Sequence, residues 1–161
     1  MSESRFPHLG MSGDARMVDV SGKAVTARSA TAAGRVLLSS ECVAALREGN
    51  VPKGDALAVA RIAGIQAAKK TPDLIPLCHP LFISGVEVAA AVIDEGVEIT
   101  ATVTTTERTG VEMEALTAVA VAGLAVIDMI KAIDRAAVIS DVRVLAKSGG
   151  RRGDWSREGD S

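Results

Sequence analysis

An acidic and a basic side chain stand three positions apart near the end of the most apolar part of the chain. Asp128 and Lys131 lie in residues 109–135, TGVEMEALTAVAVAGLAVIDMIKAIDR. If this segment is a helix, the two residues are neighbours on its surface, so a carboxylate and an ammonium can share one partly desolvated spot. Burial lowers the pKa of a lysine and an adjacent carboxylate raises it, and this balance can make a lysine a usable acid or base. From spacing alone, a surface ion pair of little energetic consequence is an equally good interpretation.

Two more carboxylates open the same segment. Glu114 comes just before the apolar run 115–127. Fourteen helical positions place it within about 40° of the face of Asp128, but roughly 21 Å away along the axis. Glu112 and Glu114 are about 200° apart, so they cannot both face one site of one chain. One of the two carboxylates can instead stabilise the helix by interacting with its positive N-terminal end.

A cysteine and a histidine lie between two prolines in residues 74–80, LIPLCHP. Proline fixes its own φ and disfavours helix for the residue before it, so His79 is expected in extended or turn geometry. We interpret His79 as a group that positions a ligand or transfers a proton. The alternative is a buried loop in which Cys78 is a core residue and His79 hydrogen-bonds a nearby carbonyl. Cys78 as a nucleophile with His79 as its base is disfavoured, because adjacent residues in an extended chain point to opposite sides.

Several basic residues indicate an anionic ligand. Lys147 in KSGGRRG is the strongest candidate, because glycines let backbone N–H groups approach a phosphate. Lys53 and Arg28 are further candidates, although a solvated surface charge is the commoner role for any one of them. The chain contains neither GxxxxGK[ST] nor GxGxxG after a predicted strand, so P-loop and Rossmann sites are excluded.

Composition narrows the class of protein. A net charge of −2 and 2% aromatic residues argue against a nucleic-acid binder. With two cysteines and two histidines in the whole chain, a structural zinc site is close to excluded, and we expect neither a metal nor a cofactor. We find no N-terminal targeting segment and therefore expect a cytoplasmic protein with free thiols. The run 115–127 is too short to span a bilayer and is expected to be a core helix, not a membrane segment.

The pattern of elements predicts a single domain over residues 1–161, with flexible tails at 1–16 and 148–161. Apolar residues at helical spacing predict helices at 39–47, 54–70 and 111–133. Strands are predicted at 82–93, 97–106 and 136–146, and residues 17–38 are expected to be extended with irregular parts. This order predicts an α+β fold in which an antiparallel sheet packs against two long helices, with ferredoxin-like topology as the commonest template.

Four segments together resemble one family. They are MVDVSGKAVTAR at 17–28, KGDALAVARIAGIQAAKKTPDLIPLCHPL at 53–81, residues 109–135 quoted above, and LAKSGG at 145–150. The chain resembles the cyclic pyranopterin monophosphate synthase (MoaC) family of molybdenum cofactor biosynthesis from residue 17 to residue 150. IPLCHPL and TGVEMEALTA are long and unusual strings, so their joint occurrence is specific.

The resemblance implies an enzyme that converts a cyclised dihydroguanosine triphosphate, supplied by an upstream radical-SAM GTP cyclase, to cyclic pyranopterin monophosphate with release of diphosphate. It implies a homohexamer built from dimers, with active sites at the dimer interface. Asp128 and Lys131 match the family's catalytic pair. Five positions match the family's substrate-binding stretches and are expected to bind substrate: Leu77, Cys78, His79, Met113 and Glu114. Glu112 lies beside Met113 in the sequence and is expected to bind substrate too. Three basic residues are expected around the triphosphate: Lys53, Arg28 and Lys147. The competing hypotheses are a non-catalytic nucleotide-binding or assembly module and a metal-dependent phosphohydrolase.

Overall fold

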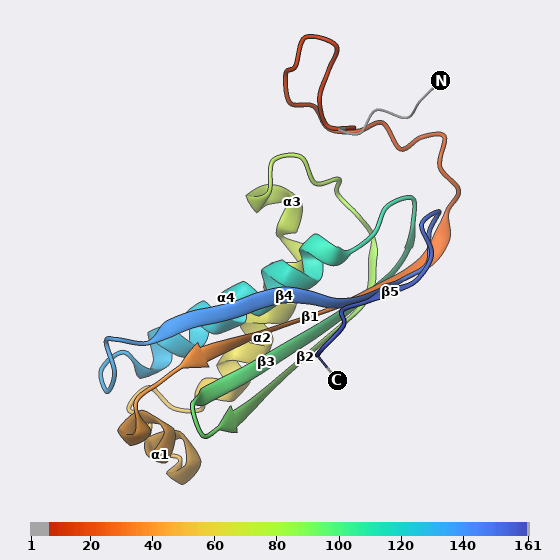
Figure 1. Cartoon of the computed structure of the whole chain (residues 1–161). Coiled ribbons are helices and arrows are strands. Elements are labelled where there is room, and N and C mark those ends of the chain that lie inside the picture. The colour runs from red at the N-terminus through yellow and green to blue at the C-terminus, as the bar shows by residue number, and fades with distance from the viewer. Residues whose placement is uncertain (1–6, 161) are drawn as a thin grey trace.

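The computed structural model describes residues 7–160 and contains one five-stranded sheet with helices on one side of it (Figure 1). The sheet order is β2-β3-β1-β4-β5, and each neighbouring pair is antiparallel. The elements are β1 (Thr26–Leu37), α1 (Ser40–Glu48), α2 (Ala56–Lys69), α3 (Thr71–Leu74), β2 (Ile83–Ile93), β3 (Gly96–Glu107), α4 (Glu112–Ile130), β4 (Val138–Ser148) and β5 (Trp155–Ser156). The predicted α+β fold is confirmed, and the order of strands and long helices is compatible with ferredoxin-like topology.

Local signals in the sequence set the ends of the helices. The Ser39 side chain accepts a hydrogen bond from the backbone N–H of Cys42, and Gly49 ends α1 with a positive φ. Asp55 caps α2 in the same way by accepting from the backbone N–H of Ala58. Gly96 sits in the predicted β2–β3 hairpin, where an added Cβ would overlap the carbonyl of Val36. These are the boundaries that the sequence predicted, within a few residues.

Helix α4 lies at the centre of the molecule, packed on α2 and on three strands of the sheet. By length and composition alone it could cross a membrane, but more than half of it is buried inside the fold. The buried side chains along α4 and the sheet are mostly alanine and valine, so the two layers approach closely. The expected core helix is confirmed, and its two ends carry most of the residues singled out above.

Helices α2 and α4 approach closely at Gly64. A Cβ added there would lie 3.0 Å from the carbonyl oxygen of Ala118, 3.2 Å from a methyl of Val88 and 3.3 Å from the Cβ of Ala122. A branched side chain has no room at this position, so Gly64 fixes the spacing between the two helices.

Replacing Gly64 with valine should therefore lower the free energy of unfolding by roughly 1–3 kcal/mol, the usual effect of overpacking a core. Urea denaturation of the variant measures the change. Ala63→Val adds a β-branched side chain to the adjacent, partly exposed position and is the matched control. Equal stability of the two variants would contradict the close approach.

Part of the predicted C-terminal tail forms regular structure. The chain turns at Gly149 and Gly150, both with positive φ, and Trp155–Ser156 then pair with β4 as β5. In the predicted N-terminal tail, Leu9 and Ala15 form an isolated bridge. Residues 1–6 and 161 of the two predicted tails lie outside the described part of the chain.

Candidate active site

Three charged residues meet at the C-terminal end of α4, and we call Lys53, Asp128 and Lys131 the C-terminal cluster. The Nζ of Lys131 donates to Oδ1 of Asp128 at 2.8 Å, and the Nζ of Lys53 donates to Oδ2 at 3.1 Å. The hydrogen bond from Lys131 lowers the pKa of Asp128 most, and the one from Lys53 adds to the effect. The carboxylate is thus ionised and shared between two cations. The predicted proximity of Asp128 and Lys131 is confirmed.

The expected desolvation of the Asp128–Lys131 pair is wrong for the single chain. Both side chains are 57% exposed. They continue the outer side of α4, on which Leu124 is also exposed, because positions 124, 128 and 131 follow at helical spacing. Neither α2 nor the sheet covers this side of the helix end, so the pair faces solvent.

A second group of predicted residues lies around the start of α4, and we call it the N-terminal cluster: Arg28, Cys78, His79, Glu112, Glu114 and Lys147. Glu112 pairs with Lys147, with 3.5 Å between Oε1 and Nζ. Glu114 instead points into the core and is only 3% exposed. The two carboxylates therefore face different surroundings, as the helical spacing predicted.

Burial controls the ionisation of the acid and the thiol in this cluster. Desolvation raises the pKa of Glu114, and the nearby charge of Glu112 adds to the rise. Desolvation also raises the pKa of the Cys78 thiol, and Glu114 contributes to it. A raised pKa disfavours the thiolate, which agrees with the view that Cys78 is not a nucleophile.

His79 has the non-helical geometry that its flanking prolines predicted. Its Nε2 lies 2.6 Å from the carbonyl oxygen of Val18, so the ring N–H donates to the backbone of the irregular segment before β1. This is the contact of the alternative interpretation, in which His79 bonds a carbonyl. The bond fixes the ring and leaves Nδ1 as the second nitrogen. The adjacent Cys78 lies near enough to Glu114, at the start of α4, to feel its charge. Sequence reasoning did not identify Val18 as the partner, because nothing local connects positions 61 apart.

Arg28, Met113 and Leu77 complete the set of predicted residues. Arg28 donates from Nε to the carbonyl of Glu107 at 2.9 Å, and its guanidinium lies beside Gly150. Met113 is exposed at the start of the helix, and Leu77 is half-buried next to Cys78. Arg28 and Lys147 thus bring positive charge to the end of the molecule where Glu112 and His79 lie.

The buried Glu114 gives a prediction about stability. Because its pKa is higher in the folded chain than in the unfolded chain, the folded state binds more protons, and stability falls as pH rises through the two pKa values. Glu114→Gln removes the buried charge, so its Tm at neutral pH should exceed that of the parent by about 2–4 °C, the shift expected for roughly 1 kcal/mol.

Thermal unfolding from pH 4 to pH 8 measures the effect of Glu114→Gln. The gain should shrink toward pH 4, because the carboxyl of Glu114 becomes protonated in the unfolded chain as well as in the folded chain when the pH falls. Glu112→Gln is the matched control, because Glu112 is paired and less buried. A Glu114→Gln variant that is less stable than the parent at pH 7 would show that the charged carboxylate is favourable where it lies.

The two clusters lie at opposite ends of α4. From Glu114 to Asp128 the helix rises roughly 21 Å, which is too far for both to contact the same reacting atoms. A hollow of about 320 Å³ beside Lys147 and another of about 510 Å³ between α1 and α2 are lined by neither Asp128 nor His79. Among residues 7–160, no three His, Cys, Asp or Glu side chains lie close enough to hold a metal ion.

Comparison with known proteins gives the family. Residues 17–150 match the MoaC family. The cyclic pyranopterin monophosphate synthase of Streptomyces avermitilis is 66% identical over 156 residues, which cover 97% of this chain and 92% of that protein. The enzyme of the same name from a Nocardioides species is 65% identical over 162 residues, covering 98% of this chain and 99% of its own. The cyclic pyranopterin monophosphate synthase 2 of Mycobacterium tuberculosis is 59% identical over 150 residues, 93% of this chain and 90% of its own. A family match over most of the chain, together with this similarity along nearly the full length of the relatives, shows that the chain belongs to the MoaC family.

Proposed function

We propose that the chain is a cyclic pyranopterin monophosphate synthase of molybdenum cofactor biosynthesis. It is a lyase that acts in the cytoplasm on (8S)-3',8-cyclo-7,8-dihydroguanosine 5'-triphosphate and releases diphosphate. The observation that carries the proposal is the 65–66% identity, over nearly the whole chain, with relatives that bear this name. The clusters at the two ends of α4 supply the chemical groups that such a reaction needs.

The C-terminal cluster supports proton transfer. The Nζ of Lys131 lies 2.8 Å from Oδ1 of the ionised Asp128, so Lys131 can deliver a proton to a leaving atom and recover one through Asp128. Lys53 shares the same carboxylate. A polyanionic nucleotide competes with Asp128 for Lys53. If Lys53 moves from Asp128 to the nucleotide, the carboxylate of Asp128 can act as a base.

The N-terminal cluster supports binding of the triphosphate and stabilisation of the departing diphosphate. Formation of a cyclic monophosphate breaks the bond between the α- and β-phosphates, and negative charge then grows on the diphosphate that leaves. Lys147 and Arg28 are cations at this end of the molecule and can hold that charge. His79 and Glu114 belong to the same cluster and are assigned to the ring system of the substrate, His79 through an imidazole held in place and Glu114 through a buried carboxyl.

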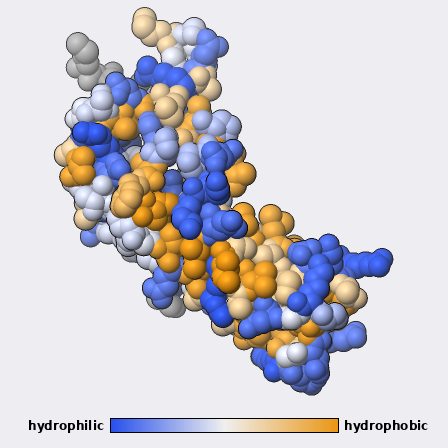
Figure 2. Space-filling model, turned by 180° about the vertical axis from the view of Figure 1, so that it is seen from behind, coloured by the Kyte–Doolittle hydropathy of each residue, from blue (hydrophilic) through white to orange (hydrophobic). Residues whose placement is uncertain are grey.

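We infer that a complete site needs two chains. The clusters are about 21 Å apart in one chain, and the C-terminal cluster is open to solvent. Apolar side chains are exposed on the helix-covered side, among them Val59, Leu124 and Ile62, the last of which is 67% exposed. Figure 2, which views the molecule from behind, shows apolar side chains in a broad band across this side. A second copy packed on this surface would bury the band and bring its N-terminal cluster to the C-terminal cluster of the first. Such a two-fold contact closes at the dimer, so the proposed homohexamer built from dimers needs a second, separate interface between dimers.

Incubating the purified chain with the cyclised nucleotide tests the function. Enzymatic GTP cyclisation by a radical-SAM enzyme supplies this substrate. The expected result is one diphosphate released per pterin formed, no activity on GTP and no loss of activity with EDTA.

Other outcomes of this assay would select a different function. Tight binding of the nucleotide without product indicates a non-catalytic binding or assembly module. Release of phosphate from GTP that EDTA abolishes indicates a metal-dependent phosphohydrolase. Either result overturns the proposal.

A further inference from the structure

The last residues of the described chain fold back along the edge of the sheet, and we call residues 155–160 the strap. Trp155 lies directly opposite Lys147 in the β4–β5 register, and Ser156 lies opposite Ala146. The backbone N–H of Arg157 donates to the carbonyl of Leu145 at 2.7 Å. Residues 155–157 therefore run beside the last part of β4, the part that carries Lys147.

An ion pair fastens the far end of the strap. Arg143 on β4 donates from Nε and Nη2 to the two carboxylate oxygens of Asp160, at 2.9 and 2.8 Å. This bidentate geometry is the strongest arrangement for an arginine and a carboxylate. Both side chains are only about a quarter exposed. Arg157 adds a contact 5.6 Å above the ring of Trp155. The strap is thus held at Trp155 and again at Asp160.

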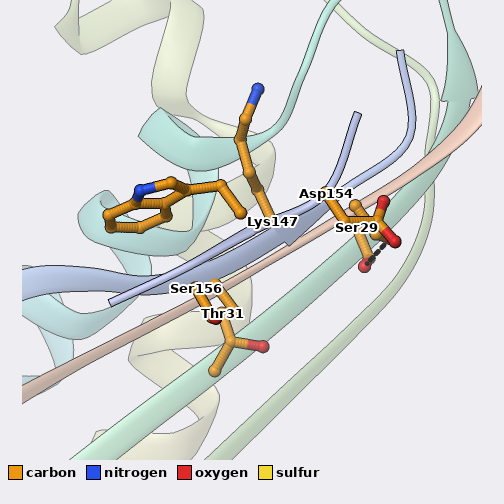
Figure 3. A pocket seen from close by; sticks show the side chains of 8 residues that line it. Ser29, Thr31, Lys147, Asp154 and Ser156 are labelled. Atoms are coloured by element: carbon orange, nitrogen blue, oxygen red, sulfur yellow. Dashed lines mark hydrogen bonds between the residues drawn. The ribbon is translucent and has the colours of Figure 1, made fainter. Parts of the chain in front are cut away.

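At its first fixed point, Trp155, the strap lies against Lys147. Residues directly opposite each other in an antiparallel pair place their side chains on the same face. The indole of Trp155 therefore stands next to the lysine stem, and both residues line the hollow beside β4. Figure 3 shows the Lys147 side chain pointing away from Ser29 and Thr31. On that side its ammonium meets Glu112 at the start of α4.

Without the strap, β4 would be an edge strand with unpaired backbone groups at Ala146 and Lys147. A lysine on a frayed strand end samples many rotamers, and holding one of them for a ligand costs free energy. With the strap in place Lys147 is only 27% exposed before any ligand binds. The strap also lies beyond residues 17–150, the part that matches the family.

We propose that the strap positions Lys147 for the phosphates of the substrate, with Trp155 and Asp160 as the positioning residues. The proposal rests on the proposed function, because it assigns the strap to the same site. It places no strap residue in contact with the reacting atoms.

Asp160→Asn tests the proposal by removing the ion pair with Arg143. We expect KM for the cyclised nucleotide to rise about tenfold with kcat unchanged, because the loss falls on binding. The fluorescence of Trp155, the only tryptophan of the chain, should shift to longer wavelength as the strap leaves β4. Asp160→Glu, which keeps the charge, should recover most of the affinity.

Asp141→Asn is the matched control. Asp141 also lies against Arg143, but through its backbone carbonyl, which accepts from Nη1 at 2.8 Å. Its φ of 57° is one that asparagine adopts readily. This variant should keep the KM and the tryptophan spectrum of the parent.

A double variant distinguishes positioning of Lys147 from general stability. In a Lys147→Ala background, Asp160→Asn should no longer change KM, because the group that the strap positions is already gone. An equal rise of KM in both backgrounds would overturn the proposal. So would a shifted tryptophan spectrum with an unchanged KM, which would make the strap a structural element only.

If the parent chain shows no turnover, the proposed function is refuted, but the proposal that the strap positions Lys147 is not. The strap is then judged by the dissociation constant of inorganic diphosphate, measured by calorimetry. Asp160→Asn must weaken this binding and Asp141→Asn must not. Equal binding by the parent and Asp160→Asn would overturn the strap proposal.

Discussion

Replacing Lys131 with alanine is expected to reduce kcat for the cyclised nucleotide by about 10²–10⁴-fold, the usual contribution of a positioned acid or base. Lys131 donates to Asp128 at 2.8 Å and is the cation with the shortest contact to that carboxylate. Its removal leaves Asp128 paired with Lys53, so the local structure persists while the proton donor is lost. Binding of the nucleotide should weaken far less than turnover, because other cations hold the phosphates. Diphosphate release and calorimetric titration measure the two effects separately.

A second lysine of the chain provides the control for Lys131→Ala. Lys70 pairs with Asp73 three positions later, at 4.0 Å, with both side chains exposed as in the Asp128–Lys131 pair. Lys70→Ala removes the same kind of surface pair, which is worth little to stability, and should leave turnover unchanged. If Lys131→Ala and Lys70→Ala released diphosphate at the same rate as the parent, the catalytic role of the pair would be wrong.

The sequence predicted the elements well wherever periodicity and caps coincide. Helix α2 shows apolar residues at spacings of three and four between Asp55 and Lys70, and the structure places the helix between those two residues. The β2–β3 hairpin carries Gly96 where a positive φ is needed. In these elements the determinants lie within a few residues of each other, so a single sequence is sufficient to find them.

Contacts between distant residues could not be predicted in this way. Lys53 reaches Asp128 across 75 positions, and Asp160 reaches Arg143 only because the chain turns back between β4 and β5, at Gly149, Gly150 and Gly153, all with positive φ. Both contacts depend on how the layers and the sheet edge are assembled, which spacing along the chain does not encode. The exposure of Asp128 has a related cause. Helical spacing shows that two side chains share a face, but whether that face is covered depends on the rest of the fold and on other chains.

The exposed C-terminal cluster leads to the second large prediction, which concerns the assembly of the site. Lys131→Ala disables the C-terminal cluster, and Glu114→Gln removes the buried acid of the N-terminal cluster while it keeps the fold. Each variant alone should turn over little substrate. Suppose that each site of a two-fold dimer combines the C-terminal cluster of one chain with the N-terminal cluster of the other. A dimer of one Lys131→Ala chain and one Glu114→Gln chain then has one site with both defects and one site with none.

Refolding the two variants together should therefore restore activity. Random pairing at equal amounts makes half of the dimers mixed, and half of the sites in those dimers are intact, so the mixture should recover about one quarter of the parent kcat. Refolding Lys131→Ala with Asp128→Asn is the control, because both defects lie in the same cluster and no pairing gives an intact site. A mixture of Lys131→Ala and Glu114→Gln that is no more active than its components would contradict a site shared between chains. The groups at the two ends of α4 would then have to act independently, since about 21 Å of helix separates them within one chain.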